Sequence, residues 1–223
     1  MLVSTKLPRL ESRSAQESAL NVLRAAILAG DIPQGSKLAQ GEIASQLGVS
    51  TTPVREALRV LEAEGLVQFV PGRGAMVPVA LDGELEDVYA GRIAIESHVA
   101  RLAALRRTED ELAAARSVLD EMSREQDPAR WFALHRHFHD VLIEACRSST
   151  LVRAATYLAN ASSISVGSAI SMRLPEGATQ AQHEAMLGAL KSRDPDAAAQ
   201  SVHDHHARTL RLLRRAASRT DSG

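Results

Sequence analysis

Seven of the eight histidines in this chain lie between residues 135 and 206. His135 and His139 are four residues apart, so a helix would place both imidazoles on one face, at a spacing that suits a shared metal ion. His183 and His205 lie in two later segments that also have helical patterns. If a bundle sets these three helices side by side, the four imidazoles could bind zinc, or nickel or another first-row divalent ion.

Each of these histidines taken singly is more simply a surface or core residue. His137 would point away from His139, and only one of the neighbours His205 and His206 could face the cavity, because adjacent helical residues point about 100° apart. An enzyme that uses the site to activate water is a further alternative. The sequence has no H-E-x-x-H motif, however, and helix geometry is expected to turn Asp140 away from its neighbour.

The elements that must position these histidines are helices, because apolar residues recur at three- and four-residue spacing along most of the chain. The exception is the stretch 66–79, two short apolar runs around Pro71-Gly72-Arg73-Gly74, which predicts a β-hairpin. Helix-start signals occur at Asp82, Thr108, Asp127-Pro128 and Asp194-Pro195. They predict an antiparallel bundle of about six helices, the later ones near residues 128–147, 150–172, 178–193 and 195–216.

Residues 40–58, QGEIASQLGVSTTPVREAL, have the pattern of two short helices joined by a tight turn. Gly48 stands where the chain must turn with positive φ, and the small Ala44 lets the second helix cross closely over the first. This pattern predicts a helix-turn-helix, whose second helix enters the DNA major groove, with the 66–79 hairpin as a wing. The residues expected at the DNA are Ser50, which would also cap the helix, Thr51, Thr52, Arg55, Arg59, Arg73 and Gly74.

Composition sets outer bounds on the class of protein. A chain of 223 residues with 45% apolar and 24% charged residues is globular and allows one or two domains. Its formal net charge of −1 gives little bulk attraction to DNA, so binding must come from a local surface. We expect a cytoplasmic protein, since no apolar run suits a signal peptide or a membrane span and the single cysteine, Cys146, excludes an internal disulfide.

Residues 16–79 resemble the winged-helix domain of the GntR family of bacterial transcription regulators. The match rests on GSKL (35–38), EIASQLGVS (42–50), TPVREALRVLEAEGLV (52–67) and PGRGAMV (71–77). Members often carry DNA-contacting arginines where this chain has Gly41 and Thr51, whereas Arg55 and Arg73 keep the family pattern. The resemblance implies DNA binding, either to an operator that differs from the common half-site or through contacts made elsewhere.

Residues 82–215 resemble the all-helical effector domain, of the FCD type, in the FadR subgroup of that family. The match rests on YAGRIAIESHVARLAA, FHDVLIEA, QHEAMLGAL and AAAQSVHDHHARTL. Many members bind a divalent metal through an aspartate and three histidines, and the matching positions here are His135, His139, His183 and His205. The register favours His205 over His206. Histidine in place of aspartate at 135 leaves more positive charge on the metal, which would strengthen capture of an acidic effector or else lower the metal affinity.

Subgroup members commonly sense small carboxylates, and Arg92 is the natural effector anchor because a guanidinium binds a carboxylate through two hydrogen bonds. The alternative for Arg92 is a surface salt bridge with Glu96, one turn later, which would contribute little. The resemblance implies a homodimer on a palindromic DNA operator, with a repressor released by its effector as the commoner outcome in the family. A bundle without metal that serves only dimerisation or partner binding remains the alternative.

The predicted fold class is mainly α, with a winged helix-turn-helix domain followed by an all-α bundle. We expect a flexible arm over 1–14, the DNA-binding domain over 15–80, the effector and dimerisation domain over 81–216 and a flexible tail over 217–223. The expected partners are double-stranded operator DNA, a small carboxylate and a second copy of the chain, with no membrane. The expected function is regulatory and not enzymatic.

Overall fold

A computed structural model describes residues 12–79, 84–170 and 176–220 of the chain. The chain forms two compact units, Met1–Pro78 and Val79–Gly223, and each is described by itself. No described helix is both long and apolar enough to cross a membrane.

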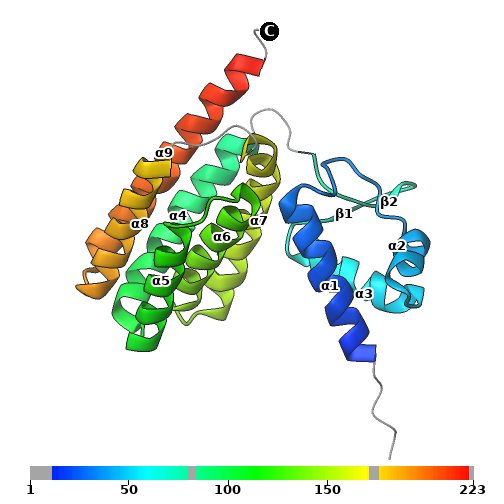
Figure 1. The fold of residues 1–223 in the computed structure, drawn as a ribbon, viewed down its shortest axis with the longest axis horizontal. Helices are drawn as coiled ribbons and strands as arrows, with labels where there is room; N and C mark the ends of the chain where they lie inside the picture. Colours follow the sequence, from blue (N-terminus) through cyan, green and yellow to red (C-terminus); the bar gives the residue numbers. More distant parts are fainter. Residues whose placement is uncertain (1–11, 80–83, 171–175, 221–223) are drawn as a thin grey trace, which may run out of the picture. The chain divides into compact units, whose positions relative to one another are not determined.

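The first unit is a winged helix-turn-helix, as predicted (Figure 1). Its elements are α1 (Ser12–Ala29), α2 (Gln40–Leu47), α3 (Thr51–Ala63), β1 (Gln68–Val70) and β2 (Gly74–Met76). The strands pair antiparallel with Phe69 opposite Ala75, which confirms the hairpin over 66–79. Both α1 and α2 pack against α3, so α3 is the central helix of this unit.

Burial along α3 explains this arrangement. Val54, Ala57 and Leu58 are fully buried on one face of α3, at the three- and four-residue spacing that the sequence shows. Ala44 of α2 is also buried, and Gly48 ends that helix in the left-handed conformation with φ of 66°. The turn predicted from this glycine is therefore confirmed.

The second unit contains six helices within its described residues, which agrees with the predicted bundle. They are α4 (Glu84–Arg106), α5 (Glu109–Met122), α6 (Pro128–Glu144), α7 (Ser149–Ile170), α8 (Glu176–Lys191) and α9 (Pro195–Thr220). Helix α4 packs against α9 and α7, α5 packs against α6 and α8, and α8 packs against α9. The arrangement places α4, α6, α8 and α9 around a shared interior (Figure 1).

Three of the predicted helix starts are confirmed by hydrogen bonds. Thr108 and Glu111 form a reciprocal capping box at the start of α5. Asp127 accepts a hydrogen bond from the Arg130 N–H, and Asp194 accepts one from the Ala197 N–H. The fourth signal, Asp82, lies outside the described residues.

Two helices extend into the terminal segments that the sequence predicts to be flexible. Helix α1 begins at Ser12, inside the arm expected over 1–14, and α9 continues to Thr220, four residues past the expected end at 216. The polar composition of these segments does not mark the helix ends, because polar residues by themselves do not stop a helix. The stretch 217–220 holds no glycine or proline, so it contains no stop signal.

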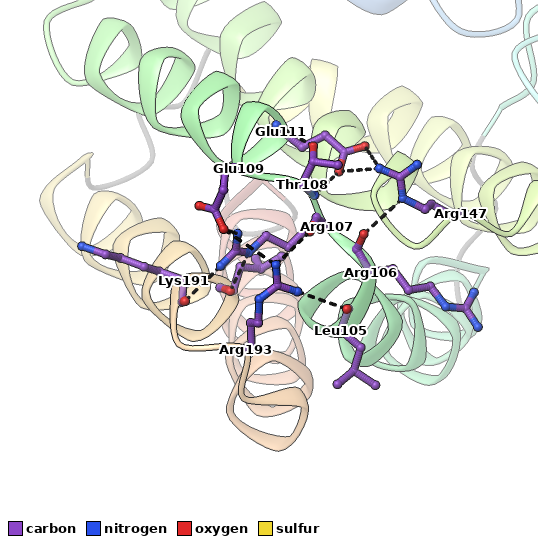
Figure 2. A network of polar contacts seen from close by, with 10 residues as sticks. Leu105, Arg106, Arg107, Thr108, Glu109, Glu111, Arg147, Lys191 and Arg193 are labelled. Atoms are coloured by element: carbon purple, nitrogen blue, oxygen red, sulfur yellow. Dashed lines mark hydrogen bonds and ion pairs between the residues drawn. The ribbon is translucent and has the colours of Figure 1, made fainter.

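Arginine side chains tie the helix ends together at one end of the bundle (Figure 2). Arg147 donates through Nε to the Arg106 carbonyl oxygen at 3.1 Å, and Arg193 donates to the Leu105 carbonyl oxygen at 3.2 Å. The last carbonyls of a helix have no partner within it, so these guanidinium groups satisfy the end of α4. The buried Arg107 does the same for α8, donating to the carbonyl oxygens of Leu190 at 3.0 Å and Lys191 at 3.1 Å.

We expect the substitution Arg107→Ala to lower the free energy of unfolding by about 3 kcal/mol, because it removes charged hydrogen bonds to two carbonyl oxygens. The Leu190 carbonyl oxygen keeps the backbone N–H of Arg193, whereas the Lys191 carbonyl oxygen loses its Arg107 donor. The measurement is urea unfolding followed by far-UV circular dichroism. The matched control is Arg101→Ala, which removes a half-exposed ion pair with Asp196 and should cost less than about 1 kcal/mol. Equal losses in the two variants would contradict this role for Arg107.

Candidate functional site

The predicted DNA-contacting residues form an exposed surface on the first unit. All seven are exposed: Ser50, Thr51, Thr52, Arg55, Arg59, Arg73 and Gly74. Ser50 occupies the N-cap position of α3, but its side chain makes no capping hydrogen bond, so that part of the prediction is wrong. The hydroxyl is exposed to solvent, which can replace the backbone partner.

Two arginines on this surface have different surroundings. Arg59 forms an ion pair with Glu62 at 3.0 Å, and its guanidinium carbon lies 4.1 Å from the centre of the Phe69 ring. Arg59 therefore joins α3 to β1 of the wing, in addition to being exposed. Arg73 lies in the tight turn of the wing between Gly72 and Gly74, whose φ values are 74° and 86°.

In the second unit the structure brings together all four histidines that the sequence singled out. His135 and His139 come from α6, His183 from α8 and His205 from α9. One ring nitrogen from each lies within 4.8 Å of those of the other three. The six pairs of ring centres are between 4.7 and 5.9 Å apart.

Several nitrogens of this cluster are buried without a hydrogen-bond partner among the described residues. They are Nδ1 of His135, Nε2 of His139, both ring nitrogens of His183 and Nδ1 of His205. A buried polar atom without a partner costs about 1–3 kcal/mol, so such atoms are rare unless something binds them. A set of imidazole donors from three helices fits a zinc ion or a neighbouring first-row divalent ion.

The surroundings also keep the four imidazoles in the form that binds metal. Burial lowers the pKa of His135, His139 and His205 well below the usual range for histidine. For His183, burial and the nearby His206 lower the pKa to about 4. At neutral pH these side chains are therefore uncharged, and each has a lone pair available to a metal ion.

His206, the rival to His205, has a different role. Its Nε2 lies 2.8 Å from a carboxylate oxygen of Glu96, and its ring is fully buried. Glu96 also accepts a hydrogen bond from Nε of Arg92 at 2.6 Å, and Arg92 donates to Ser162 Oγ at 2.8 Å. A continuous polar chain therefore links α9, α4 and α7.

Arg92 and Glu96 form an ion pair, but the alternative that places this pair at the surface is wrong. The two residues are only 8% and 3% exposed, because α9 and α7 cover this face of α4. Burial acts to raise the pKa of Glu96, but the charges of Arg92 and His206 outweigh it and bring the pKa down to about 2. Glu96 is therefore a buried carboxylate that stays charged at neutral pH.

A cavity of about 60 Å³ opens beside the histidine cluster. His135, His139 and His205 line it, and so does Arg92, the predicted effector anchor. The lining also includes residues that the sequence analysis did not assign to a site: Tyr89, Trp131, Phe132, Arg136, Ser162, Ser163, Gln182, Arg208 and Thr209. No motif marks them. Trp131, Phe132, Arg136, Gln182, Arg208 and Thr209 lie on the helices that carry the histidines, whereas Tyr89, Ser162 and Ser163 come from α4 and α7.

Asp140, which the sequence predicts to point away from its neighbour His139, also lines the cavity. A cavity between helices is wide enough to be lined by residues 100° apart on one helix. Burial is the main cause that raises the pKa of Asp140 above its usual value, opposed by the charge of Arg136.

Each of the two units matches a different known protein family. Residues 15–77 match the family described as bacterial regulatory proteins, gntR family, and residues 87–208 match the FCD domain. A probable D-xylose utilization operon transcriptional repressor from Paenarthrobacter nicotinovorans is 30% identical over 82% of this chain and 82% of its own length.

A second sequence relative and a solved structure are also similar to this chain. The uncharacterized HTH-type transcriptional regulator BphR from Paraburkholderia xenovorans is 35% identical over 70% of this chain and 67% of its own length. The solved structure of E. coli McbR/YncC has the same fold, with a TM-score of 0.77 over 90% of this chain and 97% of that one, at 21% identity. The chain therefore belongs to the GntR family of bacterial transcriptional regulators, in the subgroup with a FadR-like FCD domain.

Proposed function

We propose that the protein is a dimeric repressor that binds a palindromic operator and is released by a small carboxylate bound in a metal-containing helical domain. The observation that carries this proposal is the cluster of four imidazoles, three of them buried and His135 partly buried, beside a cavity lined by Arg92. The name of the relative from Paenarthrobacter nicotinovorans supports the repressor part. An isologous dimer matches a palindromic operator, because both have twofold symmetry.

His135, His139, His183 and His205 would hold the metal ion. A bound divalent ion supplies a Lewis acid that attracts a carboxylate oxygen. Arg92 would act next to it, because its guanidinium is held in place by Glu96 and Ser162 at the wall of the cavity. A guanidinium that is already ordered loses little side-chain entropy when a carboxylate binds.

The polar chain of Arg92, Glu96 and His206 is the part of the site that could respond to the effector. A carboxylate that binds Arg92 competes with Glu96 for the same guanidinium, and Glu96 in turn holds His206 of α9. Helix α4 is the first described helix after the segment that joins the two units. For the site to control DNA binding, the effector must bind the two conformations of the protein with different affinity.

The metal proposal is tested by the zinc content of the full chain, purified without an affinity tag and desalted after incubation with zinc. We expect about one equivalent per subunit, because four imidazoles complete a tetrahedral site. The double variant His139→Ala, His183→Ala should lose the metal. The matched control is His137→Ala, an exposed histidine on α6, which should keep it. Absence of zinc from the parent protein would contradict the site.

The DNA-binding surface is tested with a duplex selected from random sequences by the parent protein. Arg55→Ala should weaken binding by about tenfold or more if the side chain contacts a base edge. Arg73→Ala should weaken binding and reduce the slope of affinity against salt concentration by about one unit, because a phosphate contact releases counterions. Titrations by fluorescence anisotropy at several salt concentrations measure both effects.

The control for these titrations is Arg101→Ala, an exposed arginine in the second unit. Its dissociation constant should match that of the parent protein. The proposed surface would be wrong if the Arg55 and Arg73 variants bound the selected duplex as tightly as this control.

A further inference from the structure

Four hydroxyl side chains line the cavity beside the histidine cluster, and all of them except Tyr89 donate to a backbone carbonyl oxygen. Ser162 and Ser163 both donate their hydroxyl protons to the Ala159 carbonyl oxygen at 2.8 Å. Thr209 donates its proton to the His205 carbonyl oxygen at 2.9 Å. A hydroxyl has one proton, so none of these three groups can donate to a ligand without breaking its bond to the backbone.

Guanidinium groups supply most of the remaining donors. Arg92 from α4, Arg136 from α6 and Arg208 from α9 line the cavity, and Asp140 is the one carboxylate among the described lining residues. The histidines are uncharged, so the lining has an excess of positive charge even though Glu96 balances Arg92 from behind. Such a lining selects anionic oxygens over neutral hydroxyls.

Arg136 is held in a fixed position at the cavity wall. Its Nη1 donates to Ser163 Oγ at 2.8 Å and its Nη2 donates to Asn160 Oδ1 at 2.7 Å. Asn160 and Ser163 are only 1% and 7% exposed, so both acceptors belong to the packed part of α7. Arg136 is thus ordered before any ligand binds, as Arg92 is.

The arginines also lie a helical turn from parts of the metal cluster. Arg136 precedes His139 by three residues on α6, and Arg208 follows His205 by three residues on α9. Three residues correspond to about 4.5 Å along a helix, so each of these arginines starts about one turn from a histidine of the cluster. Trp131 and Phe132 form an apolar part of the same wall, where methylene groups could pack.

We propose that the effector is a short, unbranched dicarboxylate, because the cavity is small and guanidinium groups from three helices line it. One carboxylate would lie beside the histidine cluster and Arg92, and the other would be held by Arg136 and Arg208. The inference rests on the proposed function, which requires only some small carboxylate. It adds that Arg136 and Arg208 determine the specificity for a second anionic group.

This proposal separates the protein from sensors of sugar acids and of monocarboxylates. A sugar acid has several hydroxyls, and those of Ser162, Ser163 and Thr209 can donate to them only by giving up their bonds to backbone carbonyl oxygens. A monocarboxylate of the same length would place a methyl group where the second guanidinium groups lie. Both mismatches leave polar groups poorly paired, which weakens binding.

The experiment is isothermal titration calorimetry of the full chain, as purified and after zinc addition, with succinate, glutarate, butyrate and gluconate. We expect one of the two dicarboxylates to bind at least tenfold more tightly than butyrate and gluconate. Arg136→Gln should weaken that dicarboxylate by about 10- to 100-fold and change butyrate binding by less than about threefold. Arg208→Gln should have the same selective effect.

The matched control is Arg211→Gln, an exposed arginine one turn further along α9 that does not line the cavity, and it should bind like the parent. Butyrate or gluconate binding as tightly as both dicarboxylates would overturn the inference and leave the carboxylate proposal in place. Unchanged dicarboxylate binding in both cavity variants would also overturn it. If no acid binds, the carboxylate proposal fails as well, while the zinc content still decides the metal site separately.

Discussion

The second unit depends on bringing four imidazoles together at one point of its interior, three of them buried and His135 partly buried. Helices α6, α8 and α9 each contribute to this cluster, and several ring nitrogens there have no partner among the described residues. Such a cluster is unfavourable by itself, because each buried nitrogen has lost its hydrogen bonds to water. It becomes favourable when a ligand binds all four rings, so the free energy of metal binding would also stabilise the packing of these helices.

The buried hydrogen-bonded series of Arg92, Glu96 and His206 lies beside this cluster, between α4 and α9. Glu96 binds Nε2 of His206, while Nδ1 of that ring is buried without a hydrogen-bond partner among the described residues. It also holds the guanidinium of Arg92 at the cavity. Buried ion pairs contribute little net stability but fix geometry, and here the fixed geometry places a cation beside the proposed metal ion.

The two units hold the helices of their proposed sites in place by different contacts. In the first, one fully buried face of α3 leaves the opposite face exposed, and the contact of Arg59 with Phe69 connects that helix to the wing. In the second, Arg107, Arg147 and Arg193 bind the carbonyls at the ends of α4 and α8. These contacts limit fraying of the helices that carry the cavity residues.

The sequence by itself determined the helix starts at Thr108, Asp127 and Asp194, the turn at Gly48 and the wing, because each depends on neighbouring residues and on backbone conformation. It also identified the four histidines, through spacing on α6 and the family resemblance. Only the tertiary structure decided that His206 pairs with Glu96, that Arg92 is buried and that Arg136 and Asp140 reach the cavity. Those facts depend on which helices lie side by side, and residues far apart in the sequence, such as Glu96 and His206, carry no local signal of their contact.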